Sequence, residues 1–253
     1  MGLGPRIAAG QLEVNHFEVF LTATNSRGTF IVTNTSNEAV TSRLTVGDWE
    51  RAVDGTNHYT DTAGTLKGSC HPNITVFPST LLLAPQQSQT VQVTYTGGAR
   101  TTSCWSIVFV GTAPQPANIA GGARVTVELR QGIKVYVEPP GARPELQVDS
   151  VDTIHHVPAP NEPPRDTVGF DISAMVHNPG LIQSRVKGHI EYRTIKDSLV
   201  AQRAIDEFPI LPGAQRRVRS RLPQLRPGHY VVLVVFDFGG PELVAGQLEL
   251  DVK

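Results

Sequence analysis

The histidines and cysteines are the residues of this sequence whose types could support catalysis or metal binding. Of the eight histidines, His155 and His156 are adjacent, and adjacent side chains of an extended segment point to opposite sides, which argues against a two-histidine metal site. Cys70 and Cys104 show neither a CxxC motif nor a spacing to histidine that is typical of zinc. They could form one disulfide bond in an oxidising compartment or remain two buried thiols, and both states stay open.

Motifs that mark common enzyme sites are absent from the sequence. It contains no HExxH, no GxSxG, no P-loop and no EF-hand. The segment from Gly2 to Gly4 lacks the preceding strand and the third glycine of a dinucleotide-binding turn. We therefore expect a protein that is not an enzyme and that needs no metal or cofactor.

Composition and charge exclude further classes of protein. Of the 253 residues, 40% are hydrophobic and 18% are charged, which is typical of a globular protein and not of a disordered or collagen-like chain. The formal net charge of −1 argues against nucleic acid as a partner and against a polybasic membrane anchor. The longest apolar run, Tyr230 to Phe236, is too short to span a bilayer. No signal peptide is visible, so we expect either a cytoplasmic protein or one whose signal has been removed.

Alternation of apolar and polar residues predicts strands along the whole chain. Clear examples are Thr29–Thr33, Gln89–Tyr95 and Arg124–Leu129. Turns rich in glycine, proline and asparagine separate such segments. No sustained apolar stripe of helical period occurs, so the pattern favours an all-β sandwich over an α/β fold.

A proline-rich segment divides the chain into two predicted domains. Between Val137 and Glu145 lie three prolines and a glycine, which remove backbone donors and stop a paired strand. We predict one domain over residues 1–139 and a second over residues 145–253. Strands of the second domain are predicted at 146–154, 168–177, 185–192, 199–205, 216–222, 230–237 and 243–252. Because this number is typical of an immunoglobulin-like domain, we expect two tandem immunoglobulin-like β-sandwich domains.

A basic stretch runs from Arg216 to Arg221 in the second half. Alternation places Arg217, Arg219 and Arg221 on one face of a strand. Interleaved aromatic residues and a basic domain, which nucleic-acid binding would require, are both missing. A solvated outer face is therefore favoured, and an acidic partner surface is the alternative.

The first half contains four stretches whose order and spacing resemble those of a known family. They are Gly28–Asn34, Phe77–Pro85 followed by Gln89–Val93, Trp105–Pro114, and Val125–Pro139. Over roughly residues 12–140 the chain resembles the PapD-like periplasmic chaperones of the chaperone-usher pilus pathway, and the second half resembles them in architecture and linker position. The resemblance implies a periplasmic location after removal of a signal peptide. It also implies pilus, fimbrial or coat subunits and an outer-membrane usher as partners.

The resemblance also implies which residues bind a subunit. Family members lend the last strand of the first domain to an incomplete pilin subunit, a form of strand addition called donor-strand complementation. Val125, Val127 and Leu129 match the positions of the donor residues and share one face of the predicted strand. The other interpretation is that these three side chains face the domain's own core, as in most alternating strands.

Lys134 matches the family's lysine that holds the subunit's terminal carboxylate, although a solvated strand lysine is the plainer interpretation. Where the family places a partner arginine near the start of the chain, this sequence has Glu18, which could form an ion pair with Lys134. We expect residues 115–123 to form a short connection between strands, similar to family members with short loops. A disulfide between Cys70 and Cys104 would fit the implied periplasmic location.

The sequence therefore predicts a non-enzymatic chaperone that binds pilus or coat subunits and delivers them to an usher. The alternative function is a non-catalytic structural or adhesive surface module of tandem immunoglobulin-like domains. The two functions differ in whether the strand around residues 124–136 has an open edge.

Overall fold

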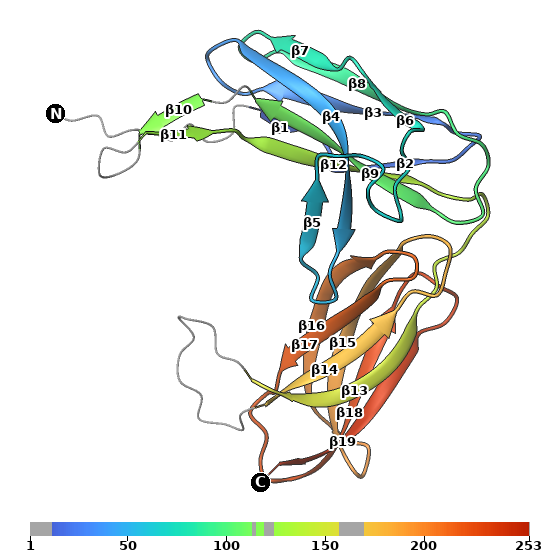
Figure 1. Cartoon of the computed structure of the whole chain (residues 1–253). Helices are drawn as coiled ribbons and strands as arrows, with labels where there is room; N and C mark the ends of the chain where they lie inside the picture. Colours follow the sequence, from blue (N-terminus) through green and yellow to red (C-terminus); the bar gives the residue numbers. More distant parts are fainter. Residues whose placement is uncertain (1–11, 113–114, 119–123, 157–169, 253) are drawn as a thin grey trace, which may run out of the picture. The chain divides into compact units, whose positions relative to one another are not determined.

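The computed structural model describes residues 12–112, 115–118, 124–156 and 170–252. These residues form β-strands and contain no helix of the length and apolar character needed to cross a membrane (Figure 1). The chain divides into two compact units, Met1–Glu50 with His58–Pro140 and Arg51–Asn57 with Gly141–Lys253. The change of unit at residues 140–141 lies within the proline-rich segment that the sequence analysis singled out.

Unit 1 contains two main sheets and a two-stranded ribbon. One sheet has the strand order β1-β3-β8-β6, formed by β1 (Leu12–Val14), β3 (Arg27–Asn34), β8 (Ser88–Tyr95) and β6 (Ile74–Phe77). The other has the order β2-β12-β9-β4-β5, with β7 also paired to β4. Its strands are β2 (Glu18–Leu21), β12 (Arg130–Val137), β9 (Cys104–Thr112), β4 (Val40–Arg51), β5 (Asn57–Thr60) and β7 (Thr80–Leu83). The ribbon consists of β10 (Gln115–Asn118) and β11 (Arg124–Val127).

Alternate residues from both sheets of unit 1 form one hydrophobic core. Phe30 and Val32 of β3 and Val91 of β8 are fully buried, as the alternation along these strands predicts. In β12 the core residues are the odd-numbered ones, Ile133, Val135 and Val137. The even-numbered residues of β12 therefore lie on the outer face of the sheet, away from this core.

Unit 2 is a second sandwich with its own core. Its sheets have the orders β13-β14-β17 and β16-β15-β18-β19. The strands are β13 (Gln147–His155), β14 (Phe170–His177), β17 (Gln215–Arg221), β16 (Leu199–Ile210), β15 (Ser184–Thr194), β18 (Gly228–Asp237) and β19 (Val244–Val252). They coincide with the seven predicted strands within a few residues at each end, except that β16 runs five residues further than expected. The prediction of an all-β, immunoglobulin-like fold is confirmed.

A buried asparagine ends an inner strand in each unit. Asn34 is the last residue of β3, and Asn178 directly follows β14; both are fully buried. In both, Nδ2 donates to the carbonyl four positions later, at 2.7 and 2.8 Å, and Oδ1 accepts the main-chain N–H two positions later, at 2.9 and 2.8 Å. Nδ2 also donates to a distant carbonyl, that of Leu83 at 3.1 Å in unit 1 and that of Ile210 at 3.0 Å in unit 2. The two asparagines therefore share these three bonds in two different sequences, and Asn34 Nδ2 also donates to Ala84 O at 3.0 Å.

The expectation of a plain connection over residues 115–123 was wrong for its first part. Residues Gln115–Asn118 form β10, which pairs antiparallel with β11. Pro116 gave this segment the appearance of a loop, but a proline is tolerated in an edge strand because its missing N–H is not needed there. Residues 119–123 lie outside the described part of the chain.

The basic stretch of the second half forms β17, as predicted. Arg217, Arg219 and Arg221 are exposed, whereas Val218 between them is buried in the core of unit 2. The alternation on one outer face is therefore confirmed, and the solvated face and the acidic partner surface both stay predictions.

Candidate functional site

The predicted donor strand consists of β11 and the first half of β12. β12 pairs antiparallel with β9 along its whole length, from Arg130 opposite Gly111 to Val137 opposite Cys104. β11 continues in the same direction and pairs with β10. Figure 1 shows this ribbon extending from the ends of β9 and β12, away from the rest of the sheet.

The opposite edge of the same strand is covered over only part of its length. β2 pairs in parallel with β12 from Lys134 to Val137, and the first main-chain bond is from Lys134 N to Phe17 O, at 2.8 Å. Within the described ranges, no strand pairs with this edge of β11, or of β12 from Arg130 to Ile133. A side chain does reach across, because Gln131 Nε2 donates to Leu12 O at 2.7 Å. Among the residues that the structure describes, the outward backbone groups of residues 124–133 are thus not paired with another strand.

The predicted donor side chains are only partly described. Leu129 lies between β11 and β12 and is 41% exposed, which does not fit a place in the core of unit 1. Val125 and Val127 are placed by their backbone alone, opposite Ala117 and Gln115 of β10. Their side chains lie outside the described part of the structure. The alternation therefore continues along the open edge, with one of its three apolar side chains seen at the surface.

Lys134 lies at the inner end of the open edge, on the outer face of the sheet. The parallel register makes Glu18 of β2 the neighbour of Lys134, as expected from the sequence. The Lys134 ammonium lies 4.4 Å from the centroid of the Trp49 ring, within the range of a cation–π contact. The Tyr136 hydroxyl, two residues along the same face, is 3.4 Å from Glu18 Oε1 and donates to it. The Lys134 ammonium thus packs against the Trp49 ring, and Glu18 is the residue beside Lys134 in the adjoining strand.

Cys70 and Cys104 form a disulfide bond in this structure. Cys104 begins β9, the strand that leads to the β10–β11 ribbon. The bond joins this strand to the loop before β6, where Cys70 N donates to Trp105 O at 3.3 Å. Of the two states left open by the sequence, the structure contains the bridged one.

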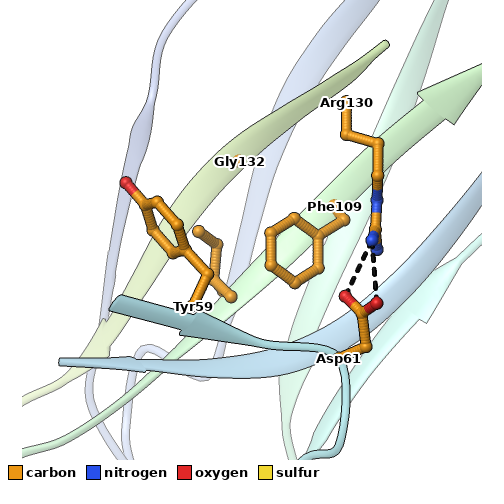
Figure 2. Close-up of a pocket in the computed structure, with 6 residues that line it drawn as sticks. Tyr59, Asp61, Phe109, Arg130 and Gly132 are labelled. Atoms are coloured by element: carbon orange, nitrogen blue, oxygen red, sulfur yellow. Dashed lines mark hydrogen bonds and ion pairs between the residues drawn. The ribbon is translucent and has the colours of Figure 1, made fainter. Parts of the chain in front are cut away.

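A hollow on the outer face of the same sheet was not predicted from the sequence. Its volume is about 460 Å³, and it is lined by Tyr59, Asp61, Ile107, Phe109, Arg130 and Gly132 (Figure 2). Arg130 and Asp61 form an ion pair in it, with Nη1 2.8 Å from Oδ1. This hydrogen bond lowers the pKa of the Asp61 carboxyl and raises the pKa of the Arg130 guanidinium. The two residues are 69 positions apart, and no sequence motif joins them.

Histidines and carboxylates form pairs but no metal cluster in the described part of the chain. His156 Nδ1 lies 2.8 Å from Asp171 Oδ2, and both side chains are partly buried in unit 2. His155, the last residue of β13, is exposed. Within the ranges that the structure describes, no group of three or more histidine, cysteine or acidic residues is arranged to hold a metal ion.

Comparison with known proteins identifies the fold. No protein-family model and no curated protein sequence matches this chain. Among solved structures, the Class 5 fimbriae chaperone CfaA matches with a TM-score of 0.55 and 12% identity, covering 93% of this chain and 98% of that one. A chain of the chaperone-tip adhesion subunit complex CsuC–CsuE, from the archaic chaperone-usher Csu pili of Acinetobacter baumannii, matches with a TM-score of 0.52 and 12% identity, covering 93% and 98%. This chain has the fold of the fimbrial chaperones.

The match to fimbrial chaperone structures extends over both units of this chain. A chain of the Salmonella enterica SafA pilin in complex with the SafB chaperone matches with a TM-score of 0.50 and 14% identity, covering 99% of this chain and 100% of that one. The second half, which resembled the family only in architecture at the level of sequence, is therefore part of the same match. Identities of 10 to 14% explain why single motifs were weak and why the order of strands carried the resemblance.

Proposed function

We propose that this protein is a periplasmic chaperone that binds pilus or coat subunits by donor-strand complementation and delivers them to an outer-membrane usher. The observation that carries this proposal is the open edge along residues 124–133, which continues into the apolar alternation of Val125, Val127 and Leu129. The fold supports it, because two of the matching solved structures are described as complexes of a chaperone with a pilin or a tip subunit. Archaic chaperone-usher pili in one of these descriptions support the usher as the second partner.

The open edge offers two kinds of interaction to a subunit that lacks a strand. Backbone N–H and C=O groups would extend the subunit's sheet, each bond contributing about 1 kcal/mol net. Burial of Val125, Val127 and Leu129 in the subunit's groove would add roughly 1.5 to 2 kcal/mol for each side chain. Ordering of both partners opposes these terms, so the capture would be reversible without nucleotide hydrolysis. Release follows when the strand of another subunit takes the same groove.

Lys134 is the proposed contact for the subunit's terminal carboxylate. Its ammonium is a point charge at the inner end of the open edge, and Trp49 restricts its position. Glu18 lies beside it and opposes a second negative charge at this place. We therefore propose that the carboxylate contributes less to binding here than the strand does.

The proposal is tested by placing one negative charge on either face of β11. Val127→Asp would put a carboxylate in the subunit's groove, where burial of an unpaired charge is costly, so capture should weaken more than a hundredfold. Thr126→Asp adds the same charge to the same strand at the neighbouring position, on the face that does not enter the groove, and is the matched control. Far-UV circular dichroism of both variants should equal that of the parent protein.

The probe in this test is the protein that co-purifies with the chain from its host, identified by mass spectrometry. It is purified in denaturant and diluted onto the immobilised parent protein or variant, and the bound amount is measured. The proposal is supported if Thr126→Asp retains the subunit and Val127→Asp does not. Equal retention by both variants would favour the structural or adhesive module, in which this edge binds no subunit.

A further inference from the structure

We infer that Arg130 is a positioning residue for the donor strand, because its ion pair with Asp61 fixes β12 at the point where the β10–β11 ribbon leaves the sheet. The inference rests on the proposed function, since it assigns the residues that hold the strand offered to a subunit.

Arg130 lies at the root of the ribbon. It is the first residue of β12, and its neighbour Leu129 accepts the last main-chain bond before the ribbon, from Thr112 N, at 3.1 Å. Beyond this point the register changes by one position. From the pair Gly111–Arg130 to the pair Gln115–Val127, the β9–β10 side advances by four residues and the β11–β12 side by three. Such a step changes the local twist and direction of a strand pair, so the direction of the ribbon needs other contacts to define it.

The side chain of Arg130 makes contacts with several strands at this root. Nη1 lies 2.8 Å from Asp61 Oδ1 and donates to Oδ2 at 2.9 Å, while Nη2 is 3.4 Å from Thr45 Oγ1 of β4. The guanidinium carbon lies 4.3 Å from the centroid of the Phe109 ring of β9. Figure 2 shows the two side chains next to each other. On the ribbon side, Nε lies 3.6 Å from Glu128 Oε1. One planar group thus joins β4, β9, the residue after β5 and the residue after β11.

Two glycines make room for this arrangement. A Cβ on Gly111, directly opposite Arg130, would meet Glu128 Oε1 at 3.0 Å and Arg130 Cγ at 3.4 Å. A Cβ on Gly47 of β4 would meet Thr60 O at 2.3 Å. Because Gly47 has no side chain, β5 can lie close enough to β4 to bring Asp61 to the guanidinium. Tyr59 of β5 also packs edge-on against Phe109, with ring centroids 6.2 Å apart. The backbone of Asp61 is therefore held close to Arg130 by β5, although the Asp61 side chain itself is exposed.

The test measures hydrogen exchange of the main-chain amides in the full chain, without any subunit. Asp61→Asn removes the charge of the acceptor, and an exposed ion pair of this kind is worth up to about fivefold in an equilibrium. Peptides covering residues 115–130 should therefore exchange three- to fivefold faster, while peptides over β18 and β19 keep the parent rate. Asp61→Glu, which retains the carboxylate, should restore most of the protection.

Glu207→Gln provides the matched control. It breaks the pair of Arg185 Nη1 with Glu207 Oε1, which has the same 2.8 Å separation but lies in unit 2, and exchange over residues 115–130 should not change. In 1 M NaCl, where the Debye length is about 3 Å, the parent protein should approach the exchange rate of Asp61→Asn, which itself stays constant. An effect of side-chain packing alone would not respond to salt in this way.

The exchange measurement and the capture measurement separate the two proposals. Exchange over residues 115–130 that stays within twofold of the parent in Asp61→Asn would overturn the inference, whether or not a subunit is captured. If exchange increases, the subunit identified above should be captured three- to fivefold more slowly by Asp61→Asn than by Glu207→Gln. Equal capture rates in these two variants would also overturn the inference. Failure of the parent protein to capture any subunit contradicts the proposed function and leaves the exchange result to decide the role of the ion pair in the fold.

Discussion

The segment of residues 124–129, which leads into β12, and the strand β19 have similar alternating sequences, but Leu129 and the apolar side chains of β19 have different surroundings. In β19 the apolar residues face the core of unit 2, with Leu250 and Val252 buried and Val244 and Leu248 packed partly against it. β18 pairs with β19 over its whole length. Leu129, by contrast, is 41% exposed at the edge of unit 1. Alternation therefore specifies a strand with one apolar face, but it does not specify which protein covers that face.

The largest expected effect comes from placing a charge in the core-facing side of β19. Leu250→Asp buries an unpaired carboxylate in unit 2 and should lower its free energy of unfolding by about 4 kcal/mol. Leu129→Asp should cost less than about 1 kcal/mol, because that side chain already contacts solvent. Urea unfolding separates the units, since both tryptophans, Trp49 and Trp105, belong to unit 1. Tryptophan fluorescence then follows unit 1, and circular dichroism follows both units.

The variants Leu129→Asp and Leu250→Asp together test whether the two side chains have different surroundings. If Leu129→Asp moves the fluorescence transition as far as Leu250→Asp moves the circular dichroism transition, Leu129 belongs to a core and the contrast between the two strands is lost.

The buried asparagines allow a comparison in which the two units should behave alike. Replacing Asn34 or Asn178 with alanine leaves buried carbonyls without their donor, which should cost about 2 to 3 kcal/mol in the unit concerned. Asn37→Ala is the control, because Asn37 is exposed in the turn that follows Asn34. Calorimetry should show one transition shifted by each variant, and a different one for each. A cost below 1 kcal/mol at either position would show that the shared bonds do not carry the stability of the turns.

The smallest expected effect concerns a buried tyrosine of unit 2. Burial raises the pKa of the Tyr192 hydroxyl to about 12, whereas the unfolded chain ionises near pH 10. Above pH 10 the unfolded state therefore releases a proton that the folded state keeps, and stability falls as the pH rises toward 12. Tyr192→Phe should remove this loss, a difference of about 1 kcal/mol at pH 11 in urea unfolding. Tyr59→Phe, at an exposed position of unit 1, should follow the parent protein at both pH 8 and pH 11.

Strands with regular alternation could be predicted from the sequence, and those with polar residues in the core could not. All seven strands of unit 2 were expected, because most of their inward positions are apolar, although Ser184 in β15 is buried and Arg216 and Ser220 flank Val218 on the inward side of β17. The long strand β4 was not expected, since Ser42 and Asp48 occupy two of its inward positions. The structure explains both polar residues: Ser42 Oγ donates to Gly111 O at 2.9 Å, and Asp48 Oδ2 accepts Thr65 N at 2.8 Å. Buried polar groups are tolerated where such partners exist, and the partners are far away in sequence.

The residues of the candidate site could be predicted from the sequence only through the family resemblance. Val125, Val127, Leu129 and Lys134 stay predictions as subunit contacts, whereas the parallel register confirms that Glu18 is the neighbour of Lys134. The open edge depends on where β2 begins, at Glu18 opposite Lys134, and the ion pair of Arg130 with Asp61 depends on how close β5 lies to β4. These properties arise from contacts between distant segments, which the pattern within one segment does not contain.

The parallel pairing of β2 with β12 limits the length of edge along which an added strand could pair. Residues 124–133, at about 3.3 Å per residue, give an open edge roughly 33 Å long. Its inner limit lies where the chain leaves β1 in one sheet, turns at Asn15 and enters β2 in the other. Under the proposed function, the length of edge open to a subunit is therefore set by β1 and β2, which lie about a hundred residues before residues 124–133 in the sequence.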